Sequence, residues 1–104
     1  MALLAALMAV TLTSMKPFYE RLDHAWDSTQ SLVCVGLDPD ESRLPDGIRG
    51  EPRPFLAFNR RIVDATAPFA CAFKPQFAYY AAAGRLDELA DTLNYIRQTY
   101  PQHI

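Results

Sequence analysis

The stretch that decides the fold is a short apolar run ending in a carboxylate, Val33-Cys34-Val35-Gly36-Leu37-Asp38-Pro39-Asp40. Such a run is typical of a strand buried on both faces in a parallel sheet, and Pro39 prevents it from continuing as a central strand. A second stretch, Ala70-Cys71-Ala72-Phe73-Lys74-Pro75, has the same design and ends in an ammonium group. Because ligands bind at the C-terminal ends of parallel strands, we expect Asp38 and Lys74 to face the same opening.

The composition is that of one small globular domain. The chain has 104 residues, half of them hydrophobic, and a net charge of -2. Without a basic block, the sequence gives no electrostatic support for nucleic-acid binding, and no stretch has the length of a membrane span. Cys34 and Cys71 are isolated, without a C-x-x-C motif or a His/Cys cluster, so we expect reduced, buried cysteines in a cytoplasmic protein and no metal site.

Lysine is rare in this chain. The sequence has eight arginines but only two lysines, Lys16 and Lys74. A lysine can give up its proton and an arginine cannot, so Lys74 at the end of a buried strand suggests a chemical role. The alternative is a strand-end lysine whose ammonium group extends into solvent. The residue pattern by itself leaves both interpretations open.

The rest of the chain alternates between predicted helices and strands. Residues 39–54 contain four of the eight prolines and two of the four glycines, which predicts a long loop, either the rim or lid of a site or a plain solvated insertion. The order of these elements predicts an α/β fold built from parallel (β/α) units. Such barrels need about 250 residues, so we interpret the chain as the N-terminal portion of a (β/α)8 TIM barrel, truncated before the third strand. The predicted elements are helices over 17–27, 55–67 and 85–100, strands over 32–37 and 69–73, a helical turn over 77–83, and the lead-in to a third strand at 103–104.

The first 14 residues form an apolar extension. We interpret residues 1–14 as a mis-assigned start, with Met15 as the natural one. A signal peptide or a packing helix are the alternatives. Residues 15–104 then form the N-terminal part of the barrel domain.

The strand-end motifs resemble a known family. Residues 32–40, together with Phe73-Lys74-Pro75-Gln76, are similar to the start of orotidine 5'-phosphate decarboxylase, in particular its longer bacterial form, and residues 58–67 and 95–97 also look like that family. The resemblance implies a (β/α)8 barrel that converts orotidine 5'-phosphate into UMP and carbon dioxide, the last step of de novo UMP synthesis. It implies no metal and no organic cofactor. We expect a homodimer for the full-length protein, with no nucleic-acid or membrane partner.

The resemblance also implies roles for the two charged residues. Asp38 would contact the ribose hydroxyls of the substrate, and Lys74 would join a Lys/Asp charge network at the reacting pyrimidine. The family's proton donor is the lysine of an Asp-x-Lys-x-x-Asp motif on the third strand, and the sequence stops at Ile104, before such a motif. We therefore expect a fragment that is inactive alone. Two alternatives are another phosphate-sugar barrel enzyme in which Lys74 forms a Schiff base, and a non-enzymatic, truncated chain that self-associates through an exposed sheet edge.

Strand geometry gives two further expectations. Side chains alternate along a strand, so an inward Asp38 puts Cys34 on its own side, whereas an inward Lys74 turns Cys71 toward the helices. The two cysteines should therefore not form a disulfide. Because neighbouring strands lie about 4.8 Å apart, we expect the side chains of Asp38 and Lys74 to approach to roughly 4–6 Å, where opposite charges stabilise each other.

Overall fold

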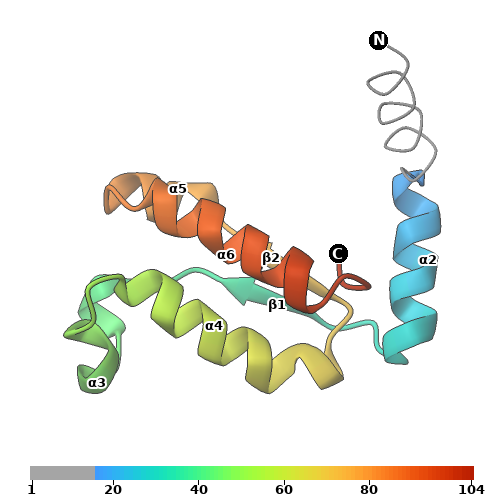
Figure 1. Cartoon of the computed structure of the whole chain (residues 1–104), viewed down its shortest axis with the longest axis horizontal. Helices are drawn as coiled ribbons and strands as arrows, with labels where there is room; N and C mark the ends of the chain where they lie inside the picture. Colours follow the sequence, from blue (N-terminus) through green and yellow to red (C-terminus); the bar gives the residue numbers. More distant parts are fainter. Residues whose placement is uncertain (1–15) are drawn as a thin grey trace, which may run out of the picture.

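The computed structural model describes residues 16–104, so the expectation for residues 1–14 lies outside the described residues. Helices and strands alternate along the chain, which confirms the predicted α/β class (Figure 1). No helix within the described residues is long and apolar enough to cross a membrane. The elements are α2 (Phe18–Thr29), β1 (Cys34–Leu37), the short helix η1 (Glu41–Arg43), α3 (Asp46–Arg49), α4 (Pro54–Thr66), η2 (Ala67–Phe69), β2 (Ala72–Pro75), α5 (Phe77–Ala82) and α6 (Leu86–Thr99).

The two strands are neighbours and run parallel. Cys34 pairs with Ala72, and the register continues to Leu37 opposite Pro75. Ile104 lies on the other side of β2, where its N–H donates to the carbonyl of Cys71 at 3.0 Å and its carbonyl accepts from the N–H of Phe73 at 2.8 Å. One residue that bonds to both sides of Ala72 shows the pattern of parallel pairing. The predicted lead-in to a third strand is therefore confirmed.

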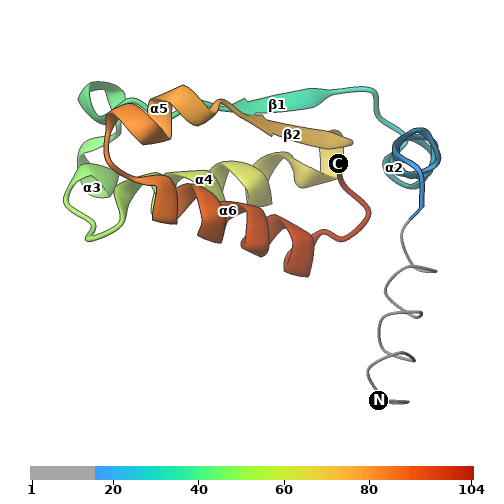
Figure 2. The ribbon, with the colours of Figure 1, turned by 90° about the horizontal axis from the view of Figure 1, so that it is seen from above.

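The helices within residues 16–104 cover one face of the strands only. Figure 2 shows β1 and β2 as one layer, with α4 and α6 as a second layer beside it. The core between the layers contains Leu37 and Phe73 from the strands and Val63 and Ile96 from the helices. Because side chains alternate along a strand, the other face carries the side chains between these. The expectation of strands buried on both faces is met on the helix side alone.

The two cysteines lie on opposite faces, as the register predicted. Cys34 is exposed, Cys71 is buried at 2% exposure, and both are free. Their separation follows from the pairing of Cys34 with Ala72, which puts Cys34 on the open face. The expectation that both cysteines are buried was wrong for Cys34, because no described element packs on that face.

The segment after β1 is more ordered than a plain loop. It contains η1 and α3, and Leu44 and Ile48 are each only 3% exposed. These two side chains pack with Phe55 and Tyr80 in a second core cluster. Residues 39–54 therefore form a fixed rim at the C-terminal end of β1, which favours the rim interpretation over a solvated insertion.

The buried face of α6 is only partly the apolar stripe of its sequence. That stripe, which the sequence predicts to face the core, consists of Leu86, Leu89, Ala90, Leu93, Ile96 and Tyr100. Ile96 is buried as expected, whereas Leu86 and Leu93 are 44% and 45% exposed. The buried positions are Glu88, Thr92 and Ile96, which follow one another at four-residue spacing. Two of the three are polar, and both are hydrogen-bonded. An apolar pattern could not reveal this face, because hydrogen-bonded polar groups can occupy a core.

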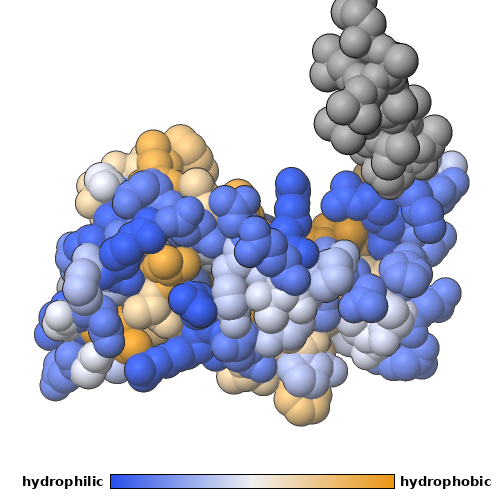
Figure 3. All heavy atoms as spheres, viewed as in Figure 1, coloured by the Kyte–Doolittle hydropathy of each residue, from blue (hydrophilic) through white to orange (hydrophobic). Residues whose placement is uncertain are grey.

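Helix α2 stands apart from the two layers, at the N-terminal end of the strands (Figure 1). Its Phe18 and Tyr19 are 60% and 65% exposed. Apolar atoms also gather on the surface over α5 (Figure 3), where Phe77 is 62% exposed. The fold thus leaves apolar side chains open at both ends of the strand layer.

Candidate functional site at the C-terminal ends of the strands

Asp38 and Lys74 lie on the same face and at the same end of neighbouring strands. Gly36 pairs with Lys74, and a Cβ atom placed on Gly36 would be 3.3 Å from Oδ2 of Asp38. The Asp38 carboxylate therefore lies over Gly36, on the open face that also carries Lys74. Among residues 16–104, no carboxylate oxygen lies within 4.0 Å of the Lys74 ammonium nitrogen, the distance limit for an ion pair. The predicted approach of roughly 4–6 Å stays a prediction.

Two side chains take over the last backbone groups where the strand ladder ends. Pro75, the last residue of β2, has no N–H to donate. The next N–H, that of Gln76, donates to Oδ1 of Asp38 at 3.0 Å. On the other strand, the carbonyl of Leu37 accepts a hydrogen bond of 2.7 Å from the hydroxyl of Tyr80. Asp38 is thus held at its carboxylate and at the peptide group that precedes it.

The Tyr80 hydroxyl belongs to a buried polar network. Its oxygen accepts from Nδ2 of Asn59 at 2.9 Å, and the same amide donates to Thr92 at 3.1 Å. Thr92 donates in turn to the carbonyl of Glu88 at 2.8 Å. Asn59, Tyr80 and Thr92 are all 0% exposed. The network connects α6 and α4 with α5 and with the end of β1.

Glu88 continues this polar layer toward the rim. Its Oε1 accepts from the N–H groups of Phe55 and Leu56 at 3.0 and 3.1 Å, so it satisfies donors at the start of α4 that have no partner within the helix. Its Oε2 pairs with Arg85 at 2.8 Å, and Arg85 also reaches Glu41 in the rim at 2.7 Å. The rim is therefore tied to α6 by charge.

Burial raises the pKa of Tyr80 to about 12, with the negative charges of Asp38 and Glu88 adding to the effect and the hydrogen bond from Asn59 opposing it. The phenol therefore keeps its proton at neutral pH and can donate to the Leu37 carbonyl. The site thus combines a charged, open side with a neutral, buried support.

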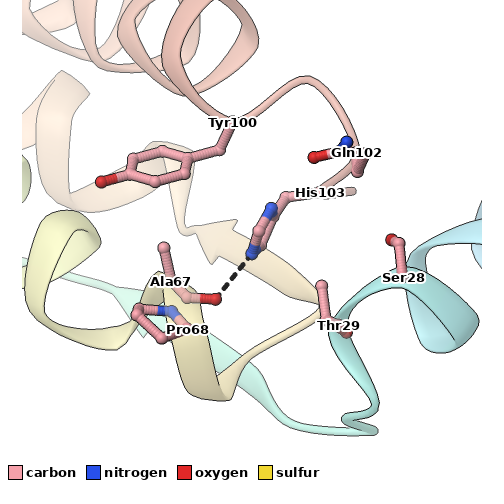
Figure 4. Close-up of a pocket in the computed structure, with 7 residues that line it drawn as sticks. All are labelled: Ser28, Thr29, Ala67, Pro68, Tyr100, Gln102 and His103. Carbon is pink, nitrogen blue, oxygen red and sulfur yellow. Dashed lines mark hydrogen bonds between the residues drawn. The ribbon is translucent and has the colours of Figure 1, made fainter.

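A pocket of about 230 Å³ opens beside Asp38. Its wall includes Arg43 and Asp40 from the rim and Tyr79 from α5. A second pocket, of about 290 Å³, lies at the opposite end of the strands, where His103 Nε2 and the carbonyl of Ala67 are 2.9 Å apart (Figure 4). Of the two predicted site residues, Asp38 lines the first pocket and Lys74 lines neither. No group of three or more possible metal ligands occurs among residues 16–104.

Sequence reasoning missed the polar support of the site. Asn59 lies between Phe55 and Val63 at four-residue spacing, and all three are buried. A polar residue at that position of an apolar stripe was a signal that a partner had to exist inside. The buried hydroxyl of Tyr80 needed a partner for the same reason.

Comparison with known proteins agrees with the strand-end motifs. No protein-family model matches the chain. Orotidine 5'-phosphate decarboxylases from Bordetella pertussis and Bordetella avium are 50% and 51% identical over 84 residues, 81% of this chain and 31% of each relative. A crystal structure from Toxoplasma gondii, described as an orotidine-monophosphate decarboxylase, matches 74% of this chain and 26% of that chain, with 34% identity and a TM-score of 0.65. The chain spans about a third of the length of the curated relatives that it matches, and it is similar in sequence and fold to that part of the orotidine 5'-phosphate decarboxylases.

Proposed function

We propose that this chain supplies the sugar-binding carboxylate and one catalytic ammonium group of an orotidine 5'-phosphate decarboxylase. Asp38 accepts hydrogen bonds from the ribose hydroxyls, since a carboxylate is a good acceptor for them, and Lys74 stands beside the pyrimidine ring. The observation that carries the proposal is the shared face, because Gly36, under the Asp38 carboxylate, pairs with Lys74. The similarity to named decarboxylases over 81% of the chain supports it.

The chemistry explains why fixed charges are needed. The bond between the pyrimidine ring and its carboxylate breaks, carbon dioxide leaves, and the electron pair stays on the ring carbon. Without a cofactor to accept that pair, the enzyme must stabilise the carbanion by charges that are already in place. An ammonium group at Lys74 favours the transition state over the ground state, since the ring charge develops only during the reaction.

The carbanion must then receive a proton from another group. The resemblance assigns this step to the lysine of an Asp-x-Lys-x-x-Asp motif on the following strand, and neither Lys16 nor Lys74 lies in such a motif. We therefore expect the 104-residue polypeptide alone not to decarboxylate orotidine 5'-phosphate. Activity is expected once further barrel strands, joined after Ile104, cover the open face and supply the proton donor.

A chimeric barrel tests the proposal. Residues 1–104 are joined at Ile104 to the remaining part of the Bordetella avium relative, and loss of substrate absorbance is followed for the chimera and for the isolated chain. The chimera should decarboxylate orotidine 5'-phosphate, and the isolated chain should not exceed the uncatalysed rate. A folded chimera without activity would overturn the proposal, and an active isolated chain would overturn the assignment of the proton donor to a later strand.

The exposed apolar residues favour one alternative, the self-associating chain. Leu32 and Val33 lead into β1 and are 77% and 53% exposed, and an uncovered strand edge promotes pairing between chains. Size-exclusion chromatography of the isolated chain measures this directly. The Schiff-base alternative has weaker support, because a lysine that reacts as a free amine needs desolvation or a neighbouring cation, and Lys74 is exposed. Borohydride trapping with a keto substrate tests it.

A further inference from the structure

We propose that Tyr80 and Asn59 are positioning residues for Asp38. They fix the orientation of the peptide group between Leu37 and Asp38, and with it the position of the substrate-binding carboxylate at the end of β1. This inference rests on the proposed function of Asp38. It concerns two residues that touch neither the open face nor the expected substrate, since both are 0% exposed. They act through the backbone of Leu37 and not through direct contact.

Tyr80 holds the Leu37 peptide group by a hydrogen bond. The Tyr80 hydroxyl donates to the Leu37 carbonyl at 2.7 Å, and that carbonyl lies in the same rigid peptide plane as the N–H of Asp38. Holding the oxygen therefore holds the plane that orients the Cα atom of Asp38. In a parallel ladder the Leu37 carbonyl would accept from the residue after its partner Pro75. That residue is Gln76, whose N–H donates to Asp38 instead, so the side chain of Tyr80 replaces a ladder partner.

Asn59 sets the direction of the hydrogen bonds made by Tyr80 and Thr92. Tyr80 gives its only hydroxyl proton to Leu37, and Thr92 gives its own to the carbonyl of Glu88. Each hydroxyl oxygen is then left as an acceptor only, and the Asn59 amide donates one N–H to each, at 2.9 and 3.1 Å. Only a side chain with two N–H donors on one nitrogen fits between them. Asn59 thus keeps the Tyr80 proton aimed at Leu37.

The Asp38 carboxylate has a hydrogen bond of its own, separate from the bond at Leu37. Asp38 is held from the other side by the N–H of Gln76, which donates to its Oδ1 at 3.0 Å. A displacement of the Leu37 peptide group would therefore also move Asp38 and weaken its hydrogen bond from Gln76. The exchange rate of the Gln76 amide hydrogen reports on the position of Asp38 without any need for substrate.

The test uses the chimeric barrel with Tyr80→Phe, which removes one oxygen and leaves the ring. Tyr95→Phe is the matched control, because the Tyr95 hydroxyl bonds to Asp64 on the exposed helix side. In Tyr80→Phe, we expect Gln76 amide exchange to rise and kcat/KM to fall about tenfold, the factor that corresponds to one hydrogen bond. Tyr95→Phe should leave both unchanged. Asn59→Ala, a second variant, should shift both readouts in the same direction as Tyr80→Phe.

A double-mutant cycle with Asp38→Ala separates positioning from general stability. If Tyr80 acts through Asp38, Tyr80→Phe should change kcat/KM by less than about twofold once Asp38 is gone, since coupled residues are not additive. An unchanged tenfold loss in that background, or unaltered Gln76 exchange in both variants, would overturn the inference. An inactive parent chimera would instead contradict the proposed function, while the exchange measurement still decides the role of Tyr80.

Discussion

The two faces of the β1–β2 layer differ although they belong to the same eight residues. On the helix side, Leu37 and Phe73 are 1% and 8% exposed and pack on α4 and α6. On the other side, Cys34, Gly36 and Lys74 are exposed. Alternation of side chains separates the two sets. We infer that one face provides stability and that the other carries the residues proposed for function, so substitutions on the two faces should have different consequences.

The largest effect on stability is expected from Leu37→Ala on the helix side. It leaves a cavity in the core and should lower the free energy of unfolding of the chain by about 2–5 kcal/mol. Cys34→Ala, on the same strand but on the open face, should change it by less than about 0.5 kcal/mol. Urea unfolding followed by circular dichroism measures both. Equal losses in the two variants would contradict the division between the faces.

A slightly smaller loss is expected from Glu88→Ala in the polar layer. The substitution leaves the N–H groups of Phe55 and Leu56 and part of Arg85 without their partner, which should cost about 2–3 kcal/mol. The neighbouring carboxylate Asp87 is the control, because its bond to Arg53 lies at the surface and is worth less than about 1 kcal/mol. The same urea experiment compares the two. A harmless Glu88→Ala would mean that the buried polar layer does not stabilise the helices.

Alkaline pH should weaken the fold through two tyrosines. The pKa of Tyr80 is raised to about 12 by burial, and that of Tyr100 to about 12 by its hydrogen bond to Asp64. An unfolded tyrosine ionises near pH 10, so between about pH 10 and 12 the unfolded chain binds fewer protons than the folded one, and stability falls as pH rises. The unfolding temperature should not change around neutral pH and should fall above about pH 10. Tyr80→Phe and Tyr100→Phe should each make that fall less steep. A decline of the same slope in both variants would contradict the assignment.

The smallest effect concerns cysteine reactivity and leaves stability unaltered. In the isolated chain, Cys34 should react with a thiol reagent faster than Cys71 by on the order of tenfold or more, because buried cysteines are inert. In the chimera, added strands should cover the open face and slow the reaction of Cys34. Mass spectrometry after timed labelling identifies the modified residue. Equal protection of Cys34 in both proteins would indicate that the isolated chain already covers this face, for instance by self-association.

The existence of the two strands was predictable from sequence because it depends on local apolar patterns. The first strand, Cys34–Leu37, lies within the predicted 32–37, whereas the second is Ala72–Pro75 and not 69–73, because Ala67–Phe69 form η2. Side-chain alternation placed Cys34 and Cys71 on opposite faces, as found. The polar layer was not predictable, because the pairing of Asn59 with Thr92 depends on how two distant helices face each other. For the same reason the expected apolar face of α6 was right for Ile96 and wrong for Leu86 and Leu93. The roles of Asp38 and Lys74 stay predictions that rest on the resemblance.

The most direct test of the division between the two faces is Lys74→Ala in the chimeric barrel, with Lys16→Ala as the control at the only other lysine. Turnover of orotidine 5'-phosphate and urea unfolding are measured on the same preparations. We predict that Lys74→Ala lowers kcat by about 100-fold or more and leaves the unfolding midpoint within error, whereas Lys16→Ala changes neither. Turnover near that of the parent chimera in Lys74→Ala, or a loss of activity that only follows a loss of stability, would contradict the account.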